Sequence, residues 1–301
     1  MSEAIRYRRH LPKRCSNGEH KQVPIQLVWA GGFISVRADP PGSAIKVEGL
    51  GQFKDAASDI PAAVGSYAIT ATHQGMKTEQ QNITVVGGQH ATVEFHLNPD
   101  PDYLKSKVID AEAKLASGDA RGTIQLVNEV LSLDPNNPEA RSLIATAYFQ
   151  EEDISNFRTT SVEAIRRGGS VRTTLMHVHS GFARKYLHPF SLTVTASTIA
   201  FDPQSSGAPC NIQPFTTTLN KVQGVEVRNG NGTTLLRLRV IDPSTSKSIT
   251  LDFAAPGSHW DLPQGQIVLG PGGPPITSSS HAPELLQGVA SVLHDAAQAT
   301  R

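Results

Sequence analysis

Apolar and polar residues alternate along the first third of the chain, from about Ile34 to Leu97. Successive side chains of a strand point to opposite faces, so this alternation predicts short strands that each bury one face. The alternating apolar positions are Ile45/Val47, Tyr67/Ile69/Ala71, Ile83/Val85 and Val93/Phe95/Leu97. Turn residues separate these runs, and we interpret Pro40-Pro41-Gly42 as a structural corner. The pattern predicts a small β-sandwich over residues 34–98.

The spacing of apolar residues becomes helical after Asn98-Pro99-Asp100. It predicts two helix-turn-helix units over residues 103–168. The turns Gly118-Asp119 and Glu152-Asp153 lie 34 residues apart, so the second unit repeats the layout of the first. Two such units rarely bury all their apolar surface alone. We therefore expect the remaining face to pack on a flanking domain, a second copy of the chain or a partner.

Alternation returns beyond Gly168-Gly169 and continues over six or seven strand-like runs. A Gly/Pro/Ser-rich stretch at residues 263–280 predicts a loop. The chain then shows Leu286, Val289 and Leu293 on one stripe of a final helix. We predict an antiparallel β-barrel with a capping helix over residues 171–298, and a multidomain α+β protein as the fold class.

The first region resembles a PEGA domain. The residues that carry the resemblance are Pro41, Gly42 and Ala44, then Gly49, Ile60-Pro61, Gly65-Ser66-Tyr67, Gly75 and the closing strand Val93–Leu97. The sequence departs from the family at the extra Ser43 and at the missing Glu, so the tetrapeptide that names the family is not intact. The resemblance implies a link with bacterial surface, envelope and signalling proteins, and it implies no catalytic activity.

The second region resembles a pair of tetratricopeptide repeats. The matching residues are the Gly118-Asp119 turn, the small residues Ala111, Ala145 and Ala164, Tyr148, and the terminal stretch LDPNNPEA. Thr123 and Phe157 depart from the family, which usually has alanine at that position. The resemblance implies a groove that binds a protein. The order of strands and final helix in the third region resembles the pleckstrin-homology superfold, which by itself says little about a ligand.

Composition limits the classes of function. The chain has 27 basic and 27 acidic residues, and its basic residues are not interleaved with aromatic ones, so we expect no nucleic-acid partner. A hydrophobic content of 38% is typical of a globular protein. The two cysteines, Cys15 and Cys210, exclude a disulfide framework and a cysteine-rich zinc site.

The N-terminal residues 1–33 combine a basic stretch with an apolar one. The basic residues are Arg6, Arg8, Arg9, Lys13, Arg14 and Lys21, and the apolar stretch runs from Val23 to Val36. This order resembles the start of a signal peptide, but Gln26 interrupts the apolar stretch and no small-x-small cleavage site follows it. We interpret residues 1–33 as a solvated tail, with an uncleaved anchor or a mis-set start as the alternative. The expected location is accordingly the cytoplasm, with envelope association as the alternative.

We expect no enzymatic activity and no cofactor, since the sequence contains no phosphate loop, dinucleotide fingerprint, nucleophile elbow or His-Glu-x-x-His pair. The one candidate metal site is His177 and His179, two residues apart on a strand, with His188 as a third ligand across a hairpin. The alternative is that His177 and His179 lie on the exposed face of the strand, with Val178 turned inward. We favour this alternative because the segment lacks a carboxylate or thiol ligand.

Two further sets of residues are candidates for binding. Arg184 and Lys185 fall in an early loop of the predicted barrel, where they could contact an anionic ligand, although two charges alone bind an anionic surface weakly. Tyr148 and Phe157 are candidates for contact with a protein partner, with a place in the repeat core as the alternative. We therefore predict a bacterial adaptor or scaffold whose repeats bind a protein. The alternative is an envelope- or membrane-associated sensor whose β-domains bind a lipid or cell-wall ligand. The sequence does not define the oligomeric state.

Overall fold

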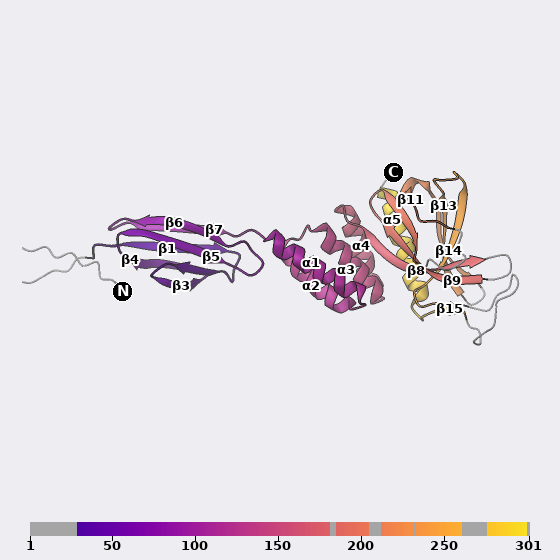
Figure 1. The fold of residues 1–301 in the computed structure, drawn as a ribbon, viewed down its shortest axis with the longest axis horizontal. Coiled ribbons are helices and arrows are strands. Elements are labelled where there is room, and N and C mark those ends of the chain that lie inside the picture. Colours follow the sequence, from indigo (N-terminus) through magenta and orange to yellow (C-terminus); the bar gives the residue numbers. More distant parts are fainter. Residues whose placement is uncertain (1–28, 181–184, 205–211, 231–232, 261–275, 300–301) are drawn as a thin grey trace, which may run out of the picture. The chain divides into compact units, whose positions relative to one another are not determined.

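The computed structural model describes residues 29–180, 185–204, 212–230, 233–260 and 276–299 of the 301-residue chain. The chain divides into two compact units, Met1–Leu104 and Lys105–Arg301. The fold is mixed α+β, as predicted, with strands in both units and five α-helices in the described residues (Figure 1). Most of the predicted tail (1–33) and of the predicted loop (263–280) lies outside the described residues.

The described part of the N-terminal unit contains seven strands in two sheets. The three-stranded sheet has the order β4-β1-β7, and the four-stranded sheet has the order β3-β2-β5-β6. The strands are β1 (Gly32–Asp39), β2 (Ala44–Val47), β3 (Gly51–Lys54), β4 (Ala56–Ala62), β5 (Gly65–Thr72), β6 (Glu79–Val85) and β7 (His90–His96). The sheets do not form the clear β-sandwich that the sequence predicts. Strands β1 and β7, from opposite ends of the unit, pair in parallel, so the sheet that they share with β4 has only three strands.

The alternation read from the sequence does decide which side chains of this unit are buried. Ile45, Ile69 and Phe95 are at most 1% exposed, and both sheets contribute to one cluster of buried apolar side chains. The Pro40-Pro41-Gly42 turn connects the two sheets. Gly42 has a φ of +94°, a conformation that glycine adopts without steric cost, and the buried Ser43 hydroxyl donates a hydrogen bond to the Pro40 carbonyl at 2.6 Å.

Four helices follow, in the two helix-turn-helix units that the sequence predicts. They are α1 (Pro101–Ala116), α2 (Ala120–Leu133), α3 (Pro138–Gln150) and α4 (Ile154–Arg166). Side chains cap three of their N-termini: Asp119, Asn137 and Asp153 each accept a hydrogen bond from a backbone N–H of the first turn. Pro138 occupies the first turn of α3, where its missing N–H costs nothing. These caps explain where α2, α3 and α4 begin.

The C-terminal strands form a seven-stranded sheet with the order β11-β10-β9-β8-β14-β13-β12. They are β8 (Val171–Ser180), β9 (Lys185–Val194), β10 (Thr198–Pro203), β11 (Phe215–Thr218), β12 (Val222–Gly230), β13 (Thr233–Ile241) and β14 (Ser248–Ala254), followed by the short pair β15 (His259–Trp260) and β16 (Ile276–Thr277). The predicted closed barrel is wrong: the sheet is open. Strands β11 and β12 are its two edges in the described residues, and the 3₁₀ turn Leu219–Lys221 joins them without a ladder of hydrogen bonds.

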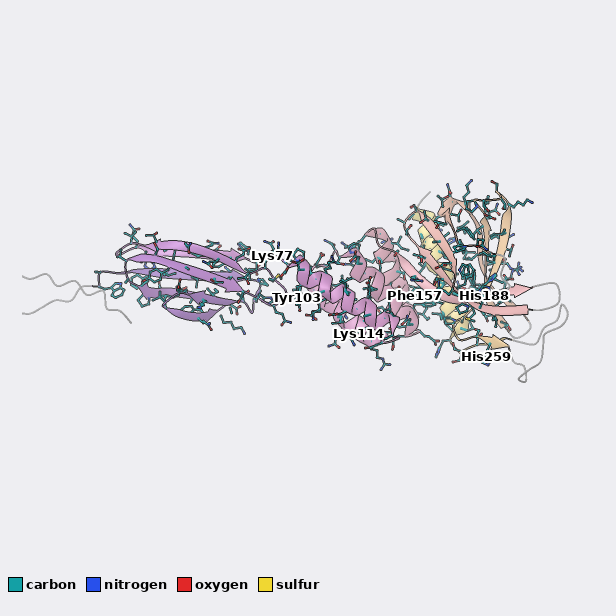
Figure 2. All side chains as sticks on the ribbon, viewed as in Figure 1. Lys77, Tyr103, Lys114, Phe157, His188 and His259 are labelled. Carbon is teal, nitrogen blue, oxygen red and sulfur yellow. The ribbon has the colours of Figure 1, made fainter. Side chains whose placement is uncertain are left out.

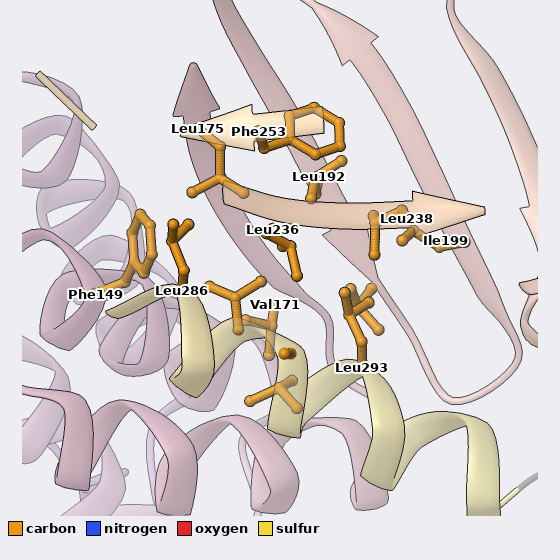
Figure 3. Close-up of a cluster of buried hydrophobic side chains, with 14 of the residues drawn as sticks. Phe149, Val171, Leu175, Leu192, Ile199, Leu236, Leu238, Phe253, Leu286 and Leu293 are labelled. Carbon is orange, nitrogen blue, oxygen red and sulfur yellow. The ribbon is translucent and has the colours of Figure 1, made fainter. Parts of the chain in front are cut away.

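The final helix, α5 (Ala282–Ala299), packs against α4, β12 and β13, so the predicted C-terminal helix is confirmed. Buried side chains of α3 and α4 belong to the same hydrophobic cluster as those of the open sheet and α5. Figure 3 shows Phe149 of α3 beside Leu286 of α5, below the leucines of the sheet. The predicted repeat region and the predicted C-terminal domain therefore form one compact unit. The two helix-turn-helix units, called the helical pair below, pack their remaining apolar face against the open sheet and α5.

Candidate binding groove

A groove of about 980 Å³ lies within the C-terminal unit, between the helical pair and the open sheet. Three walls line it: residues of α1, residues of α3, and the strands β8 and β9 with the turn that follows β14. The lining residues used below are Glu112, Leu115, Glu139, Ser142, Leu143, Thr146, Phe149, Glu152, Arg172, Thr174, Met176 and Pro189. Its volume falls at the upper end of the range found for small-molecule sites in proteins.

Every second residue of β8 lines the groove, so that this strand forms part of the groove wall on the side of the sheet. Val171, Thr173 and Leu175 are buried in the shared core, so the residues between them belong to the opposite face. Arg172, Thr174 and Met176 are on that opposite face and line the groove. The hydroxyls of Thr174 and of the buried Ser191 lie 3.3 Å apart, and Arg172 Nε lies 3.4 Å from Ser191 Oγ. Ser191 therefore holds two groove side chains in place.

The helical wall is tied directly to the start of the sheet. Ser142 of α3 donates to the Pro138 carbonyl at 2.8 Å and accepts from the Ser170 N–H at 2.9 Å. A Cβ atom at Gly169 would lie 2.7 Å from the Ser142 hydroxyl, so the chain between α4 and β8 passes as close as a glycine allows. These contacts fix the distance between α3 and β8, and they make the groove a preformed part of the unit.

The groove combines apolar side chains with carboxylates. Leu115, Leu143, Phe149, Met176 and Pro189 give it apolar surface. Among the described residues that line the groove, Glu112, Glu139 and Glu152 add three carboxylates, and Arg172 adds one guanidinium. The Glu152 carboxylate also lies 3.3 Å from Nδ1 of His281. An apolar groove with an excess of negative charge favours a ligand that has apolar side chains and basic neighbours.

The structure places the two predicted partner-contact residues away from this groove. Phe157 of α4 (labelled in Figure 2) is fully buried, with its ring 5.3 Å from that of Phe149, so it offers no surface to a partner. Tyr148 is half-buried and packs against the shared core. Phe157 therefore occupies the core position that was the alternative, whereas contact of the half-buried Tyr148 with a partner stays a prediction. The sequence analysis missed Leu143 and Thr146, whose spacing of three marks the face of α3 opposite the fully buried Ala145.

The candidate metal ligands His177 and His188 come together inside the sheet. They are directly opposite each other in the β8–β9 pair, with His177 Nδ1 3.1 Å from His188 Nε2. They are 4% and 3% exposed, and the His177 ring packs against Phe190 and Phe253 (Figure 2 labels His188). The expectation that His177 faces solvent with Val178 turned inward is therefore wrong. A shared hydrogen bond reduces the cost of burying two polar rings.

The side chain of His179 lies outside the described residues, so the three-histidine site stays a prediction. In the part of the chain that the structure describes, no three His, Cys, Asp or Glu side chains gather closely enough to hold a metal ion. Arg184 and the side chain of Lys185, the candidate anion contacts, also lie outside it, and β9 begins at Lys185. That prediction stays open too.

Ion pairs around the helices and the sheet shift several pKa values. The Lys114 ammonium lies 2.7 Å from Oδ2 of Asp119, and this bond, followed by the Gly122 N–H, lowers the pKa of the Asp119 carboxyl. The Glu151 carboxylate raises the pKa of the exposed Arg121 guanidinium. Across β13 and β14, Arg237 donates to Asp252 through two bonds of 2.6 and 2.7 Å, which raises the pKa of Arg237. None of these groups is part of the groove lining described above.

A scan against models of known protein families matches no family, and a search of curated proteins finds no significant match. None of the helices in the described residues is both long enough and apolar enough to cross a membrane.

Proposed function

We propose that the protein is a non-enzymatic adaptor or scaffold that binds a segment of a partner protein in the groove between α1, α3 and the outer face of β8. The observation that carries the proposal is the groove itself: it has about 980 Å³ of space, apolar walls and three carboxylates. Recognition of a peptide segment in an apolar groove reuses the packing of a hydrophobic core. The segment that fits this chemistry has apolar anchors with Lys or Arg beside them.

The finer description of the fold belongs to this proposal. We assign the N-terminal unit to the PEGA type, the helices α1–α4 to the tetratricopeptide type, and the open sheet with α5 to the pleckstrin-homology type. The support is the 34-residue offset between the two helix-turn-helix units, the capped turns at Asp119 and Asp153, and the succession of seven antiparallel strands and one helix. An adaptor of this composition joins a helical binding surface to two β modules.

The test uses substitutions that change the groove without touching the core. Leu143→Arg and Met176→Arg place a positive charge on opposite walls of the groove, at half-buried positions. Ile109→Arg is the matched control, because Ile109 is 53% exposed on α1 and does not line the groove. Peptides are selected against the full-length chain from a random display library, and their affinities for the variants are measured by calorimetry.

The expected result is selection of peptides with apolar and basic residues, whose affinity falls at least tenfold in Leu143→Arg and Met176→Arg and is unchanged in Ile109→Arg. Peptides that bind all three variants equally well would show that the groove is not the binding site. A library that yields no binder would remove the support for peptide recognition.

A further inference from the structure

The first half of β8 has a neighbouring strand on one side only. Strand β9 pairs with β8 along its whole length. On the other side, in the described residues, β8 pairs with β14 at Met176 and His177 alone, because β14 ends at Ala254. The residues of β8 that precede Met176 therefore form an edge within the seven-stranded sheet.

The backbone groups on this edge belong to Arg172 and Thr174. Opposite residues of an antiparallel pair alternate between those that exchange two hydrogen bonds and those that exchange none. Met176 lies opposite Pro189, which has no N–H and whose carbonyl accepts a hydrogen bond from the Gln204 N–H at 3.0 Å. Met176 therefore directs its N–H and C=O away from β9, and by the two-residue period Thr174 and Arg172 do the same.

The chain itself occupies this side of β8 before and after the two residues. The Ser170 N–H donates to the Ser142 hydroxyl of α3 at 2.9 Å, and Met176 pairs with the end of β14. Between these contacts, the N–H and C=O groups of Arg172 and Thr174 have no hydrogen-bond partner among the described residues. We call these four backbone groups the β8 edge.

The β8 edge belongs to the groove. Arg172 and Thr174 line the groove, as do the residues that flank them on β8. Pro256 and Gly257 also line it, in the turn where the chain leaves the line of β14, and Gly257 has a φ of +71°. Unpaired backbone groups at a strand edge are a template for another strand. An extended segment in the groove can therefore continue the line of β14 and pair with β8.

The groove walls select the side chains of such a segment. A strand directs every second side chain to the same face, and Leu143 and Met176 offer apolar contacts in the groove. Glu139 lies in the first turn of α3 and Glu152 lies just after its end, so carboxylates flank this wall at both ends. Charge complementarity therefore favours Lys or Arg on either side of the paired residues.

We propose that the partner segment binds as an extended strand that pairs with the β8 edge. Backbone N–H and C=O groups of the segment exchange hydrogen bonds with Arg172 and Thr174. Its alternate apolar side chains contact Leu143 and Met176, and its flanking basic residues face the carboxylates of the groove. The main-chain bonds supply affinity and the side-chain contacts select the sequence. This inference rests on the proposed function, since it defines how the groove holds its partner.

The first experiment measures hydrogen exchange of backbone amides by NMR in the full-length chain. In the free chain, Arg172 and Thr174 should exchange quickly, and Thr173 slowly because its N–H is bonded to β9. The probes are the peptides selected from the display library whose affinity falls in Leu143→Arg. They should slow exchange at Arg172 and Thr174 and leave Thr173 slow. Slow exchange at Arg172 and Thr174 in the free chain would show that the chain itself covers the β8 edge, and would overturn the proposal.

The second experiment removes one donor of the β8 edge. Thr174→Pro lacks the N–H, and proline is tolerated at a strand edge whose N–H has no partner. Thr174→Ala is the matched control, because it removes the same hydroxyl and keeps the N–H. By calorimetry, the selected peptides should bind Thr174→Pro at least tenfold more weakly than Thr174→Ala. Far-UV circular dichroism checks that both variants are folded.

A third measurement leaves the protein unmodified and changes the peptide. N-methyl groups at the alternate residues that pair with the β8 edge should weaken binding at least tenfold, whereas N-methyl groups at the residues between them should have a smaller effect. Equal losses at all positions would overturn the pairing, because only every second residue of a strand bonds to one neighbour.

The remaining outcomes separate this inference from the proposed function. Peptides that bind in the groove without slowing exchange at the β8 edge, or that become helical on binding, would overturn the extended strand and leave the proposed function standing. Protection of Arg172 and Thr174 that rises with the concentration of the free chain would show that a second copy pairs there, and would overturn the partner segment. If no selected peptide lost affinity in Leu143→Arg, both the inference and the proposed function would fall.

Discussion

The strands of the N-terminal unit bury their apolar faces against one another, whereas α3 and α4 bury theirs against a sheet and a helix that follow later in the chain. The first cluster draws all its members from residues 34–97, and the second extends from Ala145 to Ala296. A segment whose apolar side chains pack against one another can fold alone. A pair of repeats whose buried side chains pack against another part of the chain cannot. The same sharing creates the groove, because it sets α3 against the outer face of β8.

The largest expected effect comes from producing the N-terminal unit and the helical pair as separate fragments. We expect a fragment of residues 29–100 to fold, and a fragment of residues 101–168 to remain largely unfolded because Phe149 and Phe157 lose the sheet and α5. Far-UV circular dichroism and thermal unfolding measure the difference. The fragment 105–301 is the control and should unfold cooperatively. A cooperative transition in fragment 101–168 would show that the helical pair has a sufficient core of its own.

This sharing also limits deletion experiments. Removal of residues 104–167 takes Phe149, Phe157 and Ile165 out of the core of the C-terminal unit. Loss of partner binding after such a deletion would then follow from unfolding as readily as from loss of the groove. Point substitutions at Leu143 and Met176 separate the two causes, since both side chains line the groove at half-buried positions.

A smaller effect on stability is expected when one phenylalanine ring is removed from either core. Phe157→Ala should lower the free energy of unfolding of the C-terminal unit by about 3–5 kcal/mol and leave the N-terminal unit unchanged. Phe95→Ala, 1% exposed in the other core, should do the reverse by a similar amount. Urea unfolding of both variants in a Trp260→Phe background resolves them, with Trp29 emission following the N-terminal unit and helical circular dichroism the C-terminal one. If either substitution moved both transitions equally, the two cores would not be independent.

Local sequence patterns predicted the helices and strands of both units, because these patterns depend on residues that are close together in the sequence. The alternation of Ile45 and Val47 decides which side chains face inward, and Asp119 and Asp153 mark the helix starts because a cap needs only its own first turn. Closure of the C-terminal barrel failed as a prediction, because it requires β11 to pair with β12, and no local pattern contains that information.

The candidate site was harder to predict than the fold. Polar His177 indicates an exposed face when it is considered alone, and its burial depends on His188 across the hairpin. The groove joins Glu112, Leu143, Met176 and Gly257, which lie on four separate segments. Phe157 was the wrong aromatic residue to choose, since its side chain is in the core. Apart from Phe149, the groove residues named above are aliphatic, polar or charged, and they resemble any half-exposed face until the segments are assembled.

A further test of the shared core concerns the contact between α4 and α5. A Cβ atom at Gly288 would lie 2.9 Å from Cγ2 of Ile154 and 3.6 Å from Cδ1 of Phe157. Gly288→Leu should therefore overpack this contact and destabilise the C-terminal unit by about 1–3 kcal/mol in urea unfolding. Gln287→Leu, at the neighbouring exposed position, is the control and should have little effect. A neutral or stabilising Gly288→Leu would mean that α5 moves away from α4 without cost.

The smallest expected effect is a pH dependence that belongs to the helical pair alone. Lys114 and the Gly122 N–H lower the pKa of Asp119, so its charged form is more stable in the folded chain than in the unfolded one. Its contribution is present above the ordinary aspartate pKa of about 3.9 and is lost as the pH falls through the lower pKa of the folded state. Asp119→Asn keeps a capping oxygen but removes the charge.

In acid titrations of urea unfolding, Asp119→Asn should flatten the fall in stability of the C-terminal unit below pH 5, because it removes a group that binds more protons when the chain is unfolded. The transition of the N-terminal unit should keep the pH dependence of the unmodified chain, since Asp119 lies outside it. Lys114→Met removes the ammonium from the same pair and should flatten the curve in the same way. A curve unchanged by both substitutions would show that this pair does not link the stability of the helices to pH.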